Sequence, residues 1–165
     1  MSRKYGKTHI KRWNSAEWRA LSPIAQWLYD ALVSNANLSQ CGSMFWHPKV
    51  MKTMAATLTV DVLESAMREL REGLFIVLDE EVDELLIRSF IRNDVDVSNR
   101  NMMVSAIKAW DRIGSMDLKQ VVIFELMRLR DEQPDLAIWA HKDMVEAFST
   151  TAPLDPRKLL IDEPF

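Results

Sequence analysis

The chain has 165 residues, of which 48% are apolar and 27% charged, so it can bury a core and its composition excludes a disordered chain. Residues 1–60 contain eight Lys or Arg and two Asp or Glu, a net charge of +6, whereas residues 61–165 contain thirteen and twenty-two, a net charge of −9. The lone Cys41 excludes a disulfide framework, the three histidines lack metal-ligand spacing, and no apolar run approaches the length of a membrane span.

Residues 2–13 predict a basic N-terminal arm that holds five Lys or Arg and few apolar residues. Ile10 and Trp13 would anchor the arm as an edge strand and leave its cations free to meet phosphate; the alternative is a solvated terminus. Ser22, followed by proline, predicts the start of a helix, because serine is a good N-cap and proline suits the first helical position. Residues 43–46 predict a short strand.

Residues 48–72 predict two helices joined by a short turn. Pro48 opens the first helix, and helical spacing predicts that its buried side carries Val50, Met51, Met54 and Ala55. Thr59 is the expected N-cap of the second helix. The predicted buried face of that helix consists of Val62, Leu63, Ala66, Met67 and Leu70.

Residues 74–78 and 85–92 predict a β-hairpin whose connecting turn, residues 79–84, is almost entirely acidic. Beyond it the spacing of apolar residues predicts three helices, over 99–113, from the cap Ser115 to Arg130, and over 135–148. Proline interrupts the remainder of the chain, which we expect to be irregular.

These elements predict a mainly α protein with a small β-wing. We expect a winged helix-turn-helix domain over residues 1–95 that includes the basic arm, a helical extension over 96–150 and an irregular tail over 151–165. In this arrangement the second helix of the pair is carried into the DNA major groove, and the hairpin lies along the backbone. The extension is expected to pack on the first domain or to mediate dimerisation.

The sequence contains no motif that predicts catalysis. A Gly-rich phosphate loop, a nucleophile elbow and a His-rich metal pair are all missing, and only four glycines occur in the chain. The pair Glu80 and Glu81 belongs to a predicted solvated turn, where both carboxyls ionise. We therefore predict a non-enzymatic protein that needs no cofactor and no metal; a Cys–His enzyme whose partners are distant in sequence is the open alternative.

Three groups of residues are candidates for contact with double-stranded DNA. The first is the arm, expected to follow the backbone or enter a minor groove: Arg3, Lys4, Lys7, Lys11 and Arg12. The second, expected to contact phosphate, lies on the first helix of the pair: Lys49, Lys52 and Thr53. The third, expected to reach base edges with Arg68 bidentate to guanine, lies on the second helix: Thr59, Ser65 and Arg68.

Several features oppose this interpretation. Asp61 and Glu64 are predicted on the same outward face as Arg68 and would repel phosphate. The acidic hairpin turn fits a free tip or a protein contact better than a DNA contact. For any single Lys or Arg, the alternative is a solvated side chain whose stem covers apolar surface.

The motifs Lys4-Tyr5-Gly6, Trp13 and residues 19–29 resemble the start of small winged-helix proteins of actinobacterial phages and prophages. Residues 85–94 resemble their second wing strand and its exit, and residues 126–136 resemble their helical remainder, so the resemblance spans about residues 3–139. Such proteins are similar to the N-terminal DNA-binding domain of phage replication initiators. A full initiator adds a long linker and a helicase-loader-binding region, in place of which this sequence offers only the helices after Asn93.

The resemblance implies a DNA-binding protein of the bacterial host cytoplasm that acts at an origin or operator. Its expected role is phage replication initiation or phage gene regulation, with residues 96–150 forming a homodimer or binding a replication or host protein, and with no membrane partner. The alternative, from a different class, is a protein-interaction module that uses the same scaffold to modulate a host or replication protein without touching DNA. The acidic hairpin would then be one of its contact surfaces.

Overall fold

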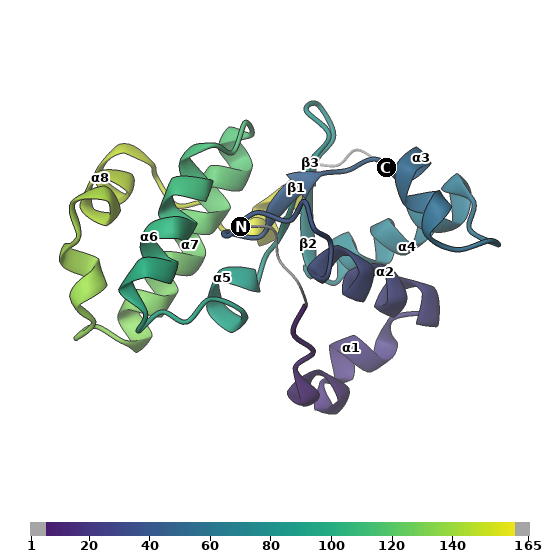
Figure 1. The fold of residues 1–165 in the computed structure, drawn as a ribbon, viewed down its shortest axis with the longest axis horizontal. Coiled ribbons are helices and arrows are strands. Elements are labelled where there is room, and N and C mark those ends of the chain that lie inside the picture. Colours follow the sequence, from purple (N-terminus) through teal and green to yellow (C-terminus); the bar gives the residue numbers. More distant parts are fainter. Residues whose placement is uncertain (1–5, 161–165) are drawn as a thin grey trace.

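The computed structural model describes residues 6–160, which form helices on two sides of one small sheet (Figure 1). The strands β1 (Ser43–Phe45), β2 (Ile76–Asp79) and β3 (Glu84–Ile87) form an antiparallel sheet in the order β1-β3-β2. Helices α1 to α4 lie to the right of this sheet in Figure 1, and α6 to α8 lie to its left. The predicted mainly helical fold with a small antiparallel β-element is confirmed.

The chain before the sheet is more helical than predicted. It forms a 3-10 helix η1 (Ile10–Asn14), a short helix α1 (Ala16–Ala20) and helix α2 (Pro23–Val33). Ser22 caps α2 as predicted, because its Oγ accepts a hydrogen bond from Ala25 N at 3.2 Å. The edge strand predicted for the arm is wrong in the described part, since residues 10–14 are helical and both Ile10 and Trp13 are exposed.

The helix pair consists of α3 (Pro48–Met51), extended by the 3-10 turn η2 (Lys52–Met54), and α4 (Val60–Glu72). Helix α4 packs against α2 and buries Leu63, Ala66, Met67 and Leu70, as predicted. The buried positions predicted for Val50, Met54 and Val62 are wrong, because all three are exposed. Only one turn of α3 is α-helical, and the tighter 3-10 turn that follows has 3.0 residues per turn, so the 3.6-residue spacing does not hold there.

The hairpin is present but shorter than predicted. Strand β3 ends at Ile87, and residues 90–93 form helix α5 (Phe90–Asn93) instead of continuing the strand. The reason is the register: Ile87 pairs with Ile76, the first residue of β2, and Leu86 pairs with Ser43, the first residue of β1. The chain beyond Ile87 therefore has no strand partner on either side.

The extension contains α6 (Arg100–Asp111), α7 (Met116–Glu132), a 3-10 turn η3 (Ala137–Ala140), α8 (Lys142–Thr150) and a 3-10 turn η4 (Pro156–Leu160). Ser115 caps α7 as predicted, its Oγ accepting from Leu118 N at 3.2 Å. The single helix predicted over residues 135–148 is divided at His141, which has extended backbone and whose Nδ1 accepts from Asp143 N at 3.3 Å. A local cap thus begins a new helix.

The extension packs directly on the first part of the chain. Helix α7 contacts β2 and α5, and one continuous cluster of buried apolar residues includes Trp18 on one side and Ala147 on the other. Polar contacts cross the same junction: Glu84 Oε2 accepts hydrogen bonds from Gly114 N and Ser115 N at 2.9 and 3.0 Å. Of the two predicted roles of the extension, packing on the first domain is the one this structure displays.

Candidate nucleic-acid interface

The α3–turn–α4 unit has a well-defined start for each helix. Pro48 occupies the first turn of α3, where its missing N–H costs no hydrogen bond. Thr59 caps α4, its Oγ1 accepting from Val62 N at 3.2 Å, and Asp61 in the first turn complements the helix dipole. Helix α4 is anchored from behind by Glu69, whose carboxylate accepts hydrogen bonds from Ser22 N and Ser22 Oγ. The outward face of α4 is therefore held in a fixed orientation.

Three cations of this unit are exposed and available to a ligand. Lys49 on α3, Lys52 on η2 and Arg68 on α4 form no ion pair or side-chain hydrogen bond with any residue of the described range 6–160. Ser65, one helical turn before Arg68, is also exposed and shares its face. These four candidates are thus exposed on two helices that contact each other.

The two threonines of the candidate set are engaged with the backbone. Thr53 donates its hydroxyl to Val50 O at 2.8 Å, so its only hydroxyl proton is used. Thr59 uses its oxygen as the α4 cap. Thr53 retains acceptor capacity and Thr59 retains its donor, but both side chains also support the local fold.

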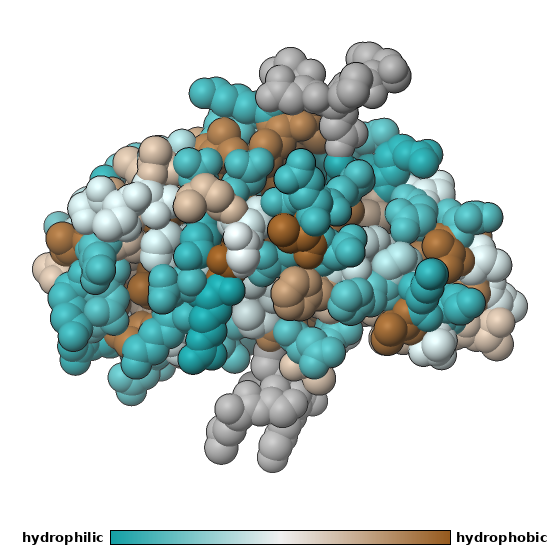
Figure 2. All heavy atoms as spheres, turned by 90° about the horizontal axis from the view of Figure 1, so that it is seen from above, coloured by the Kyte–Doolittle hydropathy of each residue, from teal (hydrophilic) through white to brown (hydrophobic). Residues whose placement is uncertain are grey.

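Other exposed groups interrupt the positive charge of the unit. Asp61 and Glu64 are exposed on α4, on the side that carries Arg68. Val50, 65% exposed, Met54 and Val62 add apolar surface. In Figure 2, where α3 lies toward the right, apolar residues are scattered among hydrophilic ones at that end of the molecule. The surface is accordingly mixed in character.

Arg12 is not the free cation that the sequence predicted for the arm. The guanidinium of Arg12 lies 4.5 Å from the Trp18 ring centroid and 5.1 Å from that of Tyr29, and its Nη2 lies 2.8 Å from Asp30 Oδ1. The expectation that Arg12 is free to meet phosphate is therefore wrong, because its guanidinium lies against the rings of Trp18 and Tyr29 and beside the carboxylate of Asp30.

The other arm candidates have varied placements. Lys7 donates to the backbone oxygen of Asp94 at 3.4 Å, and Lys11 is exposed. Arg3 and Lys4 lie outside the described residues. In Figure 1, η1 and α1 lie at the bottom and α3 at the upper right, so the arm and the helix pair occupy separate regions.

The hairpin tip is an acidic turn, as predicted. Residues 80–83 connect the strands, and Asp83 adopts a positive φ of 51°. Glu80 Oε1 lies 2.6 Å from Arg71 Nη1, near the end of α4, and Asp79 Oδ1 accepts from Glu81 N at 3.0 Å. Arg71 thus compensates part of this charge, and the tip still presents carboxylates rather than cations.

The described residues also bear on thiol, metal and membrane chemistry. Burial raises the pKa of the Cys41 thiol, although hydrogen bonds from Ser39 and Ser43 lower it, so this sulfur is not held as a thiolate. Within residues 6–160, no group of three or more His, Cys, Asp or Glu is arranged to hold a metal ion. None of the helices in that range combines the length and apolarity needed to cross a bilayer.

Comparison of the chain with known proteins gave no match to a protein-family model, a curated protein or a solved structure.

Proposed function

We propose that this protein binds double-stranded DNA without catalysing a reaction, through the α3–turn–α4 unit of a winged helix-turn-helix. The element order α2, β1, α3, α4, β2, β3, with β1 paired to β3, supports this architecture. Helix α4 enters the major groove and α3 crosses the backbone. The sequence resemblance to phage proteins supports the further assignment to phage replication initiation or phage gene regulation.

The observation that carries the proposal is the contrast in pairing among the cations. Arg71, Arg88 and Arg92 each form an ion pair with a carboxylate. Lys49, Lys52 and Arg68, which lie on the two helices, do not pair within the described residues. A cation that no carboxylate neutralises can pair with a DNA phosphate, and this pairing releases the counterions condensed on the DNA.

The residues divide between two roles. Lys49 and Lys52, at the end of α3 and in η2, contact phosphate and set the orientation of the protein. Arg68 reaches a guanine edge from α4, with Ser65 beside it. Asp61 and Glu64 repel the backbone, but a carboxylate directed into the groove accepts a hydrogen bond from the cytosine amino group. This mixture favours selectivity over general affinity for DNA.

The experiment is selection of fragments bound by the full chain from the genome that encodes it, followed by titration of one bound fragment at several salt concentrations. The proposal expects enrichment at an origin or promoter and an affinity that falls steeply with salt. Replacement of one phosphate-contacting lysine lowers the salt slope by roughly 0.9. No retained fragment, or retention that ignores salt, contradicts the proposal.

A protein-interaction module on the same scaffold is the second candidate. The exposed Val50, Met54 and Val62 favour it, because apolar side chains on the α3–α4 face suit a protein partner, and the acidic hairpin tip offers a second contact. This candidate predicts salt-insensitive capture of a protein partner that is lost in Val50→Ser. The same variant would retain DNA affinity if the first candidate holds.

A further inference from the structure

A groove of about 560 Å³ lies beside the helix pair, between β1 and the start of α3 on one wall and α6 on the other. Phe45 and His47 line the first wall, and Ser105, Lys108 and Arg112 line the second. The sequence did not predict this groove, because its walls come from segments about sixty residues apart. It shares Val50 and Met51 with the helix pair but none of the proposed DNA-contacting residues.

The first wall carries an exposed aromatic platform. Phe45 ends strand β1 and is 59% exposed, an unusual position for a phenyl ring beside a buried sheet. Its ring stacks nearly parallel to that of His47, with centroids 6.1 Å apart and an interplanar angle of 19°. His47 precedes α3 without making a side-chain cap, so its ring is not required for the helix. Two nearly parallel rings, one phenyl and one imidazole, are thus exposed at the surface.

The second wall carries unpaired positive charge. Ser105, Lys108 and Arg112 recur at helical spacing on one side of α6, while Ala106, Ile107 and Trp110 bury the other side. Lys108 and Arg112 are exposed and form no ion pair with residues of the 6–160 range. Both lie at the C-terminal end of α6, where they complement the helix dipole without being neutralised by a carboxylate of the described residues.

One carboxylate also borders the groove, but its charge is compensated. Glu84 is only 5% exposed, and its Oε2 accepts the two backbone hydrogen bonds from Gly114 and Ser115 at the start of α7. The positive end of that helix dipole stabilises the carboxylate. The charge that a ligand meets in the groove is therefore that of Lys108 and Arg112. Asn37 and Gln40 add exposed amides at its rim.

We propose that this groove binds a segment of single-stranded DNA. One unstacked base lies on the Phe45–His47 platform, and the adjoining phosphates contact Lys108 and Arg112. The bases of a duplex cannot stack on Phe45 and His47, because they are stacked on each other; only an unstacked base exposes its face. The site extends the proposed function without depending on it, since none of these four residues belongs to the proposed duplex contacts.

The test uses the full chain and a fluorescently labelled oligothymidylate, with binding followed by anisotropy. Phe45→Leu keeps an apolar side chain but removes the aromatic face, and is expected to weaken binding roughly 5- to 150-fold. Lys108→Gln combined with Arg112→Gln is expected to lower the salt slope by roughly 1.4, which corresponds to two phosphate contacts on a single strand. Lys142→Gln removes an exposed lysine outside the groove and is the matched control.

The outcomes are distinguishable from those of the duplex proposal. Arg68→Ala should leave oligothymidylate affinity unchanged, and Phe45→Leu should leave affinity for a blunt duplex unchanged. The proposal is overturned if the Phe45→Leu variant binds oligothymidylate as tightly as the unaltered chain. It is also overturned if the salt slope of the double variant equals that of Lys142→Gln, or if thymidine monophosphate binds as tightly as the oligonucleotide. Both sets of changes fall on exposed side chains, and circular dichroism verifies that each variant is folded.

Discussion

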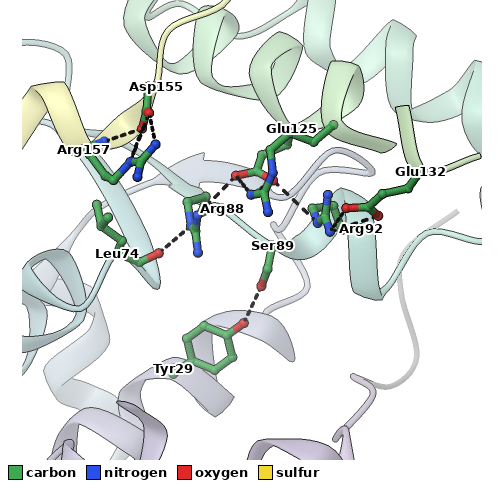
Figure 3. A network of polar contacts seen from close by, with 10 residues as sticks. Tyr29, Leu74, Arg88, Ser89, Arg92, Glu125, Glu132, Asp155 and Arg157 are labelled. Carbon is green, nitrogen blue, oxygen red and sulfur yellow. Dashed lines mark hydrogen bonds and ion pairs between the residues drawn. The ribbon is translucent and has the colours of Figure 1, made fainter. Parts of the chain in front are cut away.

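At the junction between α5 and α7, three arginines surround one buried carboxylate, whereas Lys49, Lys52 and Arg68 of the helix pair are exposed and form no ion pair within residues 6–160. Glu125, 1% exposed, lies 3.3 Å from Arg88 Nη1, 3.1 Å from Arg128 Nη1 and 3.6 Å from Arg92 Nε (Figure 3). Glu132 accepts a further bond from Arg92 Nη2 at 2.9 Å. Arg88 and Arg92 join the two parts of the fold through this carboxylate, whereas Arg68 on α4 remains available for a ligand.

The difference shows why charge counted along the sequence is a weak guide to a binding surface. The excess of positive charge in residues 1–60 includes Arg12, which is packed between aromatic rings. The acidic remainder includes Glu125 and Glu132, whose charges are matched inside the molecule. Whether a cation is neutralised by a carboxylate inside the molecule depends on three-dimensional placement, which a charge count along the sequence does not contain.

The largest expected effect is at the junction. Glu125→Ala leaves three arginines without their shared carboxylate, and we expect the free energy of unfolding to fall by about 3–5 kcal/mol. Urea denaturation measures this change. The control is Glu132→Gln, whose carboxylate is 50% exposed and whose loss should cost less than about 1 kcal/mol. Equal losses for the two variants would contradict the central role assigned to Glu125.

The next effect tests the outward cations. Arg68→Ala is expected to weaken binding to a selected DNA site by about 1–3 kcal/mol and to relax preference at one base pair, without lowering stability. Anisotropy titrations on the site and its single-base variants measure both. Arg19→Ala, an exposed arginine on α1 outside the helix pair, is the matched control. A loss that is uniform over all sequences would make Arg68 a phosphate contact.

The third prediction concerns Arg12, a cation that is packed inside the molecule rather than exposed to a ligand. Arg12→Gln removes the cation from the Trp18 and Tyr29 rings and from Asp30, and should lower the free energy of unfolding by about 1–2 kcal/mol. The salt slope of DNA binding should stay unchanged. Lys11→Gln, on the exposed neighbour, should change neither stability nor slope. A reduced slope in Arg12→Gln alone would restore Arg12 to the binding surface.

The smallest effect is expected for a single phosphate contact. Lys52→Gln should lower the salt slope of duplex binding by roughly 0.9 while leaving sequence preference intact. Titration with potassium chloride measures the slope. Lys158→Gln removes an exposed lysine in η4 and should leave it unchanged. If the two variants behave alike, Lys52 does not contact the backbone.

The local features of the fold were predictable from the sequence. Ser22, Thr59 and Ser115 begin helices at the predicted positions, because capping depends on residues within three positions of each other. The buried face of α4 was predictable for the same reason, since a regular helix of thirteen residues repeats its spacing. The acidic turn of the hairpin also lies where its composition placed it.

The rest depended on partners distant in sequence. The end of β3 follows from where β1 and β2 begin, and the exposure of Met54 follows from a helix that tightens to a 3-10 turn after Met51. The enclosure of Arg12 requires the rings of Trp18 and Tyr29 to meet in space. Neither spacing nor composition contains that information.

Glu84 has a consequence for how the molecule comes apart. Glu84 belongs to strand β3, and its carboxylate accepts hydrogen bonds from Gly114 N and Ser115 N, between α6 and α7. The strand and the start of α7 are therefore joined directly by hydrogen bonds. On heating, we therefore expect the first part of the chain and the extension to unfold in one cooperative transition, rather than the extension unfolding first. A fragment that ends at residue 95 would lack the hydrogen-bond donors of Glu84 and the helix α7 that packs on β2. We expect such a fragment to aggregate rather than to fold as a separate domain.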